Sequence, residues 1–528
     1  MTAQPISNLV EDMAPPFLEV MNVRKSFGGV QALKNVSLKM RGGEISHLMG
    51  ENGCGKSTLI KIISGAQPAT EGTMRIDGRP IGSVAGDMGP IGGLRAGIET
   101  VYQDLSLLPN LSVAENVALT GQLVAADGRL ARRLHLTALR ETAARALAQV
   151  HLPTDRDFLD RRTDTLPLAS RQLVAIARAI AAEARLVIMD EPTTSLTRHE
   201  VENLLQVVRK LLDRGVSILF VTHKLDEIKS LGGRAIIMRD GEVVAERDVN
   251  TTSKSEISEL MTGRPISEDR YRSHPSIGEP LLGVSGLSAE AFRNISLQVR
   301  KGEIVGITGL LDSGRNELAL ALAGVQPANS GTIRLDGRDI RLPTPAAAIG
   351  AGIGYVPEDR LTEGLFLEKP IQDNITLPVL DRLRHAFGMI SSKRVRRLAQ
   401  DKIADLQVVA PDVSEPVQSL SGGNQQRVLI GRWLTIEPRL LILHGPTVGV
   451  DVGSKDTIFR IIQKLAEDGM GVIIISDDLP ELLQNCDRIL VMRRGAIVAE
   501  RDARRVTEDD LYTIMSSGPD APAQEALS

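Results

Sequence analysis

The chain repeats itself once, at a spacing of about 250 residues. GTMRIDGR at Gly72–Arg79 returns as GTIRLDGR at Gly331–Arg338, and MRDGEVVAERD at Met238–Asp248 returns as MRRGAIVAERD at Met492–Asp502. The two offsets are 259 and 254 residues. Repeats of this length are too long for solenoid units and match the size of whole domains. We therefore predict two related domains, whose comparison shows which chemistry each one retains.

The repeat sets the expected domain boundaries in the 528 residues. We predict a first domain over 17–262 and a second over 281–516, joined by a polar, proline-containing linker over 263–280. The tail 517–528 is expected to be disordered. Within each domain, short β-branched runs such as SILFVTH and GVIIIS alternate with longer Ala/Leu/Arg-rich stretches. That alternation predicts an α/β architecture around a buried, mostly parallel sheet.

Composition restricts the class of protein. Two cysteines are too few for a disulfide framework and fit a reducing compartment. The N-terminus has no signal-peptide pattern, and no window approaches the roughly 18 apolar residues of a membrane span. A net charge of −4 and 2% aromatic residues argue against a nucleic-acid partner. We expect a cytosolic protein of two domains.

The first domain contains a glycine-rich loop between a short apolar strand and a helix. Glu44–Ile60 reads EISHLMGENGCGKSTLI, in which GxxxxGKS is the P-loop pattern. Glycine lets the backbone amides of such a loop turn toward phosphate oxygens, and the following helix N-terminus adds its positive end. Lys56 is expected to reach the β- and γ-phosphates, and the Ser57 hydroxyl to ligate Mg²⁺. The predicted nucleotide-binding residues of the loop are Gly50, Glu51, Asn52, Gly53, Cys54, Gly55, Lys56, Ser57 and Thr58.

Two further buried strands end in polar residues. LVIMDEPTT at Leu186–Thr194 places Asp190 and Glu191 at a strand end. Asp190 suits a Mg²⁺ partner, and Glu191 suits the base that polarises an attacking water. The strand ILFVTH ends at His223, either a γ-phosphate contact or an ordinary surface histidine.

These motifs, in this order, resemble the nucleotide-binding domain of ABC ATPases. GENGCGKST, VYQD at Val101–Asp104, MDEPT and VTH carry the resemblance, which covers essentially the whole chain, once per domain. It implies two tandem domains, each with a mixed sheet and a helical subdomain, that use ATP and Mg²⁺. By the same resemblance Gln103 touches Mg²⁺ and senses the γ-phosphate, His223 is a switch histidine, and Phe27 stacks on adenine.

The family also needs an LSGGQ-type signature, and the two domains differ in it. The first domain has LPLASRQ at Leu166–Gln172, with proline in the serine position and alanine in a glycine position. Pro167 has no N–H to donate. The second domain has LSGGNQ, so the resemblance assigns γ-phosphate contacts to its signature residues Ser421, Gly422, Gly423 and Gln425.

The second domain has lost the other parts. Its loop reads GLLDSGRNE, with Arg315 in the lysine position and Asn316 in the Mg²⁺-ligand position. His444-Gly445 replaces the acid pair, Asp477 replaces the switch histidine, and Pro357 lies at about the glutamine position. Loss of one base lowers a rate by about 10²–10⁴. We expect negligible turnover there, while the charge of Arg315 leaves nucleotide binding open.

In ABC proteins, each ATP is held between the loop of one domain and the signature of the other. The loop, Asp190 and Glu191 of the first domain then meet the intact signature of the second, which gives one complete site. The opposite pairing joins only degraded parts. The resemblance therefore implies an internal pseudo-dimer with one working site.

A narrower resemblance comes from KSFGGVQAL at Lys25–Leu33 and from YVPEDR and LSGGNQQRV in the second domain. These look like the duplicated ATP-binding subunits of ribose-, galactose- and xylose-type importers. The implied protein lies peripherally on the cytoplasmic face of a bacterial membrane, under two permease copies fed by an extracytoplasmic sugar-binding protein. Segments 104–117 and 358–375 would dock the permease; the alternative is that they are ordinary helix-capping loops.

Two other functions remain open at this point. One is an importer ATPase for nucleosides or a furanose-type signal. The other is a soluble duplicated ABC factor acting on ribosomes or DNA, which the charge of −4 and the short linker disfavour.

Overall fold

The computed structural model describes residues 16–28, 30–81, 89–125, 135–193, 196, 198–222, 224–265, 270–271, 276–310, 312–384 and 388–516. The chain divides into two units, Met1–Pro265 and Ile266–Ser528. The division falls inside the predicted linker. Among the described residues, no helix is both long and apolar enough to cross a membrane.

The first unit contains ten strands and nine α-helices among its described residues. Its strands are β1 (Leu18–Phe27), β2 (Val30–Met40), β3 (Ile45–Met49), β4 (Glu71–Ile76), β5 (Arg79–Pro80), β6 (Ile98–Val101), β7 (Leu186–Asp190), β8 (Ser217–Val221), β9 (Arg234–Arg239) and β10 (Glu242–Asp248). Its helices are α1 (Lys56–Ile63), α2 (Pro90–Arg95), α3 (Val113–Ala125), α4 (Leu136–Gln149), α5 (Arg156–Leu159), η1 (Thr163–Thr165), α6 (Leu168–Ala181), α7 (Arg198–Asp213), α8 (Leu225–Leu231) and α9 (Lys254–Thr262).

The second unit repeats this plan. Its strands are β11 (Pro280–Ser288), β12 (Ile295–Arg300), β13 (Ile304–Gly309), β14 (Ser330–Leu335), β15 (Arg338–Ile340), β16 (Ile353–Val356), β17 (Leu440–His444), β18 (Gly471–Ile475), β19 (Arg488–Arg493) and β20 (Ala496–Asp502). Its helices are α10 (Arg315–Leu322), α11 (Pro345–Ala351), η2 (Arg360–Gly364), α12 (Ile371–Thr376), η3 (Leu377–Leu383), α13 (Ser392–Asp405), η4 (Val417–Ser419), α14 (Gly422–Leu434), α15 (Val452–Glu467), α16 (Leu479–Asn485) and α17 (Glu508–Ser516).

Each unit has one large and one small sheet. The large sheets run β6-β7-β8-β3-β9-β10 and β16-β17-β18-β13-β19-β20, the same order in both units. Within them the first five strands are parallel and the last is antiparallel. The small sheets, β2-β1-β4-β5 and β12-β11-β14-β15, are antiparallel. The predicted α/β fold with mixed sheets and helical subdomains is confirmed.

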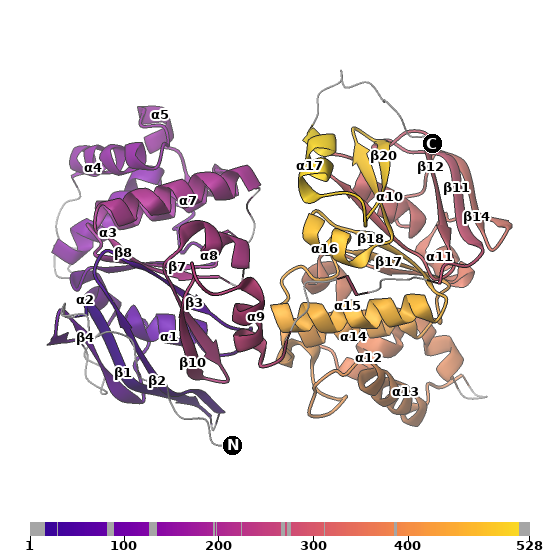
Figure 1. The fold of residues 1–528 in the computed structure, drawn as a ribbon, viewed down its shortest axis with the longest axis horizontal. Helices are drawn as coiled ribbons and strands as arrows, with labels where there is room; N and C mark the ends of the chain where they lie inside the picture. The colour runs from indigo at the N-terminus through magenta and orange to yellow at the C-terminus, as the bar shows by residue number, and fades with distance from the viewer. Residues whose placement is uncertain are drawn as a thin grey trace. The chain divides into compact units, whose positions relative to one another are not determined.

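Buried strands alternate their side chains between two apolar cores in each unit. Ile188 and Leu219 face the core shared with α1 and the small sheet, whereas Val187 and Phe220 face the core shared with α3, α4, α6 and α7. In Figure 1 the helices α3, α4 and α5 accordingly lie at the opposite end of the first unit from β1, β2 and β4. The large sheet is thus covered on both faces, as a parallel sheet requires.

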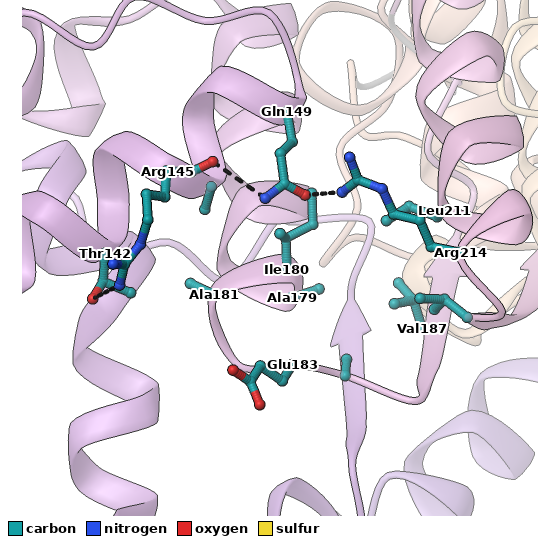
Figure 2. A pocket seen from close by; sticks show the side chains of 13 residues that line it. Thr142, Arg145, Gln149, Ala179, Ile180, Ala181, Glu183, Val187, Leu211 and Arg214 are labelled. Carbon is teal, nitrogen blue, oxygen red and sulfur yellow. Dashed lines mark hydrogen bonds between the residues drawn. The ribbon is translucent and has the colours of Figure 1, made fainter.

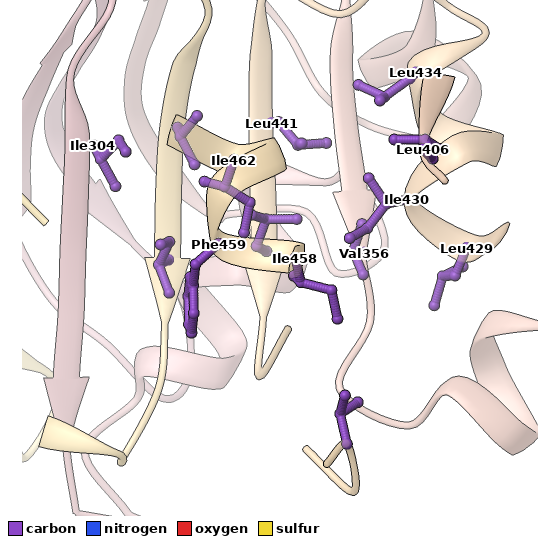
Figure 3. Close-up of a cluster of buried hydrophobic side chains, with 14 of the residues drawn as sticks. Ile304, Val356, Leu406, Leu429, Ile430, Leu434, Leu441, Ile458, Phe459 and Ile462 are labelled. Atoms are coloured by element: carbon purple, nitrogen blue, oxygen red, sulfur yellow. The ribbon is translucent and has the colours of Figure 1, made fainter. Parts of the chain in front are cut away.

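In the second unit, the apolar core on the helical face of the large sheet holds α14, the helix that begins in the signature. Ile430 of α14 and Ile458 and Phe459 of α15 lie with Leu441 of β17 in one buried cluster (Figure 3). Each such side chain contributes about 1.5–3 kcal/mol on burial. The N-terminal turn of α14 is therefore carried on a rigid helix anchored to the sheet.

Candidate functional site

The parallel strands of the first unit bring the predicted residues to one sheet edge. The P-loop follows β3, Gln103 follows β6, Asp190 ends β7, and His223 would follow β8. Carboxyl ends of parallel strands share one edge, and ligands of open α/β sheets bind there. His223 itself lies outside the described residues.

The loop between β3 and α1 has the backbone of a tight cradle. Gly50, Gly53 and Gly55 have φ of 151°, 85° and 105°, conformations that favour glycine. A Cβ on Gly50 would lie 2.3 Å from the Met238 carbonyl oxygen. Side chains are thus excluded at Gly50 by contact and at Gly53 and Gly55 by backbone conformation.

Lys56 opens α1 and lies across this loop. Its side chain is buried, and Nζ donates to the carbonyl oxygens of Gly50 at 2.7 Å and Glu51 at 2.9 Å. Ser57, next on the helix, is exposed, as are Asn52 and Gly53 in the loop. A fixed ammonium beside exposed loop amides and a hydroxyl is the arrangement that binds phosphate.

Cys54 has a different place from its neighbours. It is buried beneath the loop, with Sγ 3.9 Å from Lys56 Nζ, and burial raises the pKa of its thiol. A protonated, covered thiol is a packing residue of the loop.

Asp190 lies in an unfavourable place for a charge. Burial, followed by the negative charge of Glu191, raises its pKa from 3.8 to about 6, while the charges of Lys56 and Lys61 act against the increase. The carboxylate is therefore poised to gain from a cation or proton beside it.

Glu191 has a strained backbone. Its φ is +48°, in the left-handed region, and its N–H donates to the Val221 carbonyl oxygen at 2.9 Å. Gly445 is the matching residue of the second unit, with φ of +55° and a 2.8 Å bond from its N–H to the Ile475 oxygen. This conformation costs a non-glycine residue about 1–2 kcal/mol. The second unit places glycine there, and only the first unit carries a glutamate despite the strain.

Two other predicted residues are accessible. Gln103 is exposed in the loop after β6. Phe27, at the end of β1, has 45% of its surface exposed, with Lys25 Nζ 5.3 Å from the ring centroid. An exposed ring on a strand end can stack on a base, and its role stays a prediction.

The two signature segments have the same backbone conformation at the residue before the helix. Ser421 caps α14 with φ −62° and ψ 156°, and Pro167 caps α6 with φ −55° and ψ 152°. Asn424 Nδ2 donates to Ser421 Oγ at 2.9 Å. A Cβ on Gly423 would lie 2.1 Å from Ser454 Oγ, so Ser454 on α15 leaves no space for a side chain at this position.

Strand register corrects one sequence assignment in the second unit. Ile98 pairs with Leu186, and Ile353 pairs with Leu440. The offset between the units is therefore 254 on one strand but 255 on the other. The residue that matches Gln103 is Glu358, so the placement of Pro357 there was wrong by one position.

Side chains of the second cradle bond to one another. His444 Nε2 donates to Asn316 Oδ1 at 3.1 Å and lies 3.2 Å from Glu358 Oε2, and Tyr355 donates its hydroxyl to Nδ1 at 3.3 Å. Burial, and then the charge of Arg315, lowers the pKa of His444 to about 4. A neutral histidine thus occupies the position that Asp190 holds in the first unit. The sequence showed each substitution but not this network.

The arginine of the second cradle also has an internal partner. Arg315 is buried, and its Nη2 lies 3.7 Å from Asp477 Oδ2. These are the residues in the positions of Lys56 and His223. The positive charge is retained, but its partner is now an acid at the position of His223.

A cavity of about 340 Å³ in the first unit is separate from this constellation (Figure 2). It lies among α4, α6 and the end of α7, where Arg214 donates to Gln149 and Gln149 donates to the Arg145 carbonyl at 3.3 Å. None of the predicted site residues that the structure describes lines it.

Comparison with known proteins agrees with the duplicated plan. The ABC transporter family profile matches residues 33–194 and 292–448, once in each unit. A solved dimeric ATP-binding cassette in a post-hydrolysis state, bound to ADP and Pi, is 29% identical, covers 44% of this chain and all of that chain, and has a TM-score of 0.39.

Curated relatives match nearly the full length. The ribose import ATP-binding protein RbsA of Yersinia pestis (strain Antiqua) is 40% identical over 94% of this chain and 96% of its own. Those of Mesorhizobium japonicum (RbsA 2) and Rubrobacter xylanophilus (RbsA 3) are 42% and 41% identical, over 92% and 94% of this chain and 94% and 98% of their own. The chain therefore belongs to the ABC transporter family, as an ATPase with two ATP-binding cassettes in one polypeptide.

Proposed function

We propose that this ATPase energises import of a monosaccharide, with ribose the first candidate, through a membrane permease fed by an extracytoplasmic binding protein. The relatives named for ribose import support the substrate class, since they match more than nine tenths of the chain. In this proposal the chain lies peripherally on the cytoplasmic face of a bacterial cell membrane, and two permease copies bind it.

Complementary losses in the two units carry the proposal of one composite ATP site. The first unit has the strained Glu191, the Lys56 cradle and Asp190, but Pro167 in its signature. The second unit has Ser421 in the same backbone conformation, and a cradle whose side chains bond to one another. The parts lost in one unit are those kept in the other, which supports pairing across the units.

The residues of this site have distinct roles in the proposal. Loop amides and Lys56 hold the β- and γ-phosphates, and Phe27 stacks on the base. Glu191 accepts a hydrogen bond from the attacking water and polarises it toward the γ-phosphate. Ser421 Oγ and the amides of Gly422 and Gly423 donate to the γ-phosphate from the second unit. ATP shifts the units toward closure because only the closed state makes both sets of contacts.

The first cradle also suits Mg²⁺. Burial, and then the charge of Glu191, raises the pKa of Asp190, so a cation beside it would be favourable. The exposed Ser57 hydroxyl and Gln103 amide lie at the same sheet edge. Oxygen donors of this kind are those that Mg²⁺ prefers. Ser57, Asp190 and Gln103 would hold the ion, which when bound neutralises phosphate charge.

Asp190→Asn is expected to stabilise the fold while abolishing ATP hydrolysis. Because the folded pKa is about 6 against 3.8 ordinarily, the folded state binds more protons between these values, and stability falls as pH rises through that window. The amide carries no such penalty, so Tm at pH 7.5 should rise by about 2–4 °C per kcal/mol recovered. Scanning calorimetry at pH 5 and 7.5 measures this. The gain should shrink at pH 5, and Asp213→Asn, at the exposed end of α7, should show neither change; a gain equal at both pH values would contradict the account.

Two apolar residues mark the proposed docking surfaces. Leu108 and Phe366 are 53% and 58% exposed. In each unit a buried asparagine fixes the loop: Asn116 exchanges bonds of 2.8 and 3.0 Å with the Leu108 backbone, and Asn374 exchanges two of 2.9 Å with that of Phe366. A rigidly held exposed apolar residue at matching places in both units supports a shared contact with the permease.

The double variant Leu108→Asp, Phe366→Asp should uncouple the chain from its partner. Uptake of radiolabelled sugar by cells is expected to fall about tenfold or more, the effect of losing about 1.4 kcal/mol of interface energy. Hydrolysis by the purified chain should stay near that of the wild type because neither residue lies in the ATP site. Val498→Asp, on exposed β20, is the control and should leave uptake unchanged. Equal uptake by the double variant and the control would count against these surfaces.

The substrate class is tested through the partner proteins. Calorimetric titration of the cognate binding protein with ribose, galactose, xylose and nucleosides is expected to give tight binding for a monosaccharide. Tight binding of a nucleoside alone would replace the sugar assignment and leave the ATPase assignment in place.

A further inference from the structure

Arg360 joins three parts of the second unit. It opens the turn η2 just after β16, and its guanidinium donates through Nη1 to the Val448 carbonyl at 2.7 Å and through Nη2 to that of Gly449 at 3.2 Å. Its Nε lies 3.4 Å from Gln425 Oε1. A planar fork of this kind fixes orientation as well as distance.

These contacts surround the signature. Gln425 lies on the first turn of α14 and donates to the Leu420 carbonyl at 3.1 Å, directly before Ser421. A Cβ on Gly422 would lie 2.8 Å from Arg360 Nη2 and 3.2 Å from the Gly449 oxygen. The signature glycine therefore lies directly against the guanidinium, which a side chain at this position would displace.

The turn that carries Arg360 is itself fixed. Asp359 accepts from the N–H groups of Leu361 at 2.9 Å and Thr362 at 3.0 Å, and from the Thr362 hydroxyl at 2.6 Å. The arginine therefore projects from a backbone turn that these bonds hold in place.

The first unit lacks both this arginine and an intact signature. At the strand offset of 255, Leu105 stands in the place of Arg360, and it is buried. At the offset of 254, Arg171 replaces Gln425 and the 37%-exposed Leu168 replaces Gly422. The arginine and the glycine that it contacts are present together in one unit and absent together in the other.

We propose that Arg360 is a positioning residue for the signature end of the composite ATP site. It holds the first turn of α14 against the loop 448–449, so that Ser421 and the following amides keep one arrangement. The first amides of a helix have no partner within the helix, so this turn needs fixing from outside. Donors aid a reaction most when they are fixed before it occurs. The proposal rests on the composite site.

The test is steady-state ATP hydrolysis by Arg360→Leu, which introduces the residue found in the first unit. We expect kcat to fall about tenfold or more. This decrease should be smaller than the roughly 10²–10³-fold decrease caused by removing a donor itself. KM for ATP should change little, because Lys56 and its loop are untouched. Arg360→Lys should recover part of kcat, since an ammonium reaches one carbonyl but cannot form the fork. Arg334→Leu, on the exposed β14–β15 hairpin, is the control.

Three other results would overturn the role of Arg360. Wild-type kcat in Arg360→Leu, with an inactive Ser421→Pro chain, overturns the role of Arg360 and leaves the composite site standing. Full activity in both variants overturns both. The Tm of Arg360→Leu is measured as well. If this variant has a lowered Tm and regains wild-type kcat when it is assayed well below that Tm, its role is purely structural and the proposal is also overturned.

Discussion

Glu191→Gly is expected to abolish ATP hydrolysis and to raise the unfolding temperature together. Loss of the base should lower kcat by about 10²–10⁴. The backbone φ of +48° costs a glutamate about 1–2 kcal/mol of stability. Glycine removes this strain, but its greater loss of entropy on folding offsets part of the gain. Removing the charge also relieves the neighbouring Asp190, whose pKa Glu191 raises. We expect a net gain of about 1 kcal/mol, or about 2–4 °C in Tm.

Two variants separate the charge from the strain. Glu191→Gln loses hydrolysis to a similar extent but keeps the strained backbone, so its Tm should lie below that of the glycine variant. Gly445→Glu makes the reverse change in the second unit, where a Cβ would lie 2.8 Å from Val448 Cγ2. It should lower Tm and restore no turnover. A Glu191→Gly chain less stable than Glu191→Gln would contradict the strain argument.

Ser421→Pro is expected to stop hydrolysis from the other half of the chain without unfolding it. Ser421 has φ −62°, close to that of proline, and the preceding Leu420 has an extended backbone with ψ 152°. Pro167 already occupies the same conformation in the first unit. Loss of the hydroxyl removes a γ-phosphate donor, so kcat should fall about 10²–10³.

The measurements are kcat, Tm and binding of a fluorescent ATP analogue. Tm should remain near the wild-type value, and the analogue should still bind because the first cradle is intact. Pro167→Ser is the matched control, and its kcat should equal that of the wild type. The substitution is cleaner than Gly423→Asp, since any side chain at Gly423 would collide with Ser454. Normal turnover by Ser421→Pro would mean that the second unit's signature does not serve the first cradle.

Much of this site could be predicted because its parts are local. The P-loop glycines, Lys56 and the acid pair lie in contiguous motifs, and a parallel sheet brings strand ends to one edge. The duplicated ABC fold followed from the same motifs and their repetition. The functional roles of all these residues, like the switch role of His223 and the stacking role of Phe27, stay predictions.

Other features depend on backbone geometry and contacts that cannot be read from the amino-acid sequence. The one-residue change between β6 and β7 is invisible at a fixed offset, so Glu358 was missed as the counterpart of Gln103. The strain at Glu191 appears only in its φ, although Gly445 at the matching position was a usable signal. Arg360 acts through carbonyls of residues 448 and 449, almost ninety positions away, and its only trace was the difference from Leu105.

The central claim, one working site built from both halves, is tested most directly by counting ATP retained by the Glu191→Gln chain. After incubation with Mg²⁺ and labelled ATP and rapid gel filtration, we expect one ATP per chain, and none when Ser421→Pro is added to the same chain. Retention that survives Ser421→Pro would contradict the account.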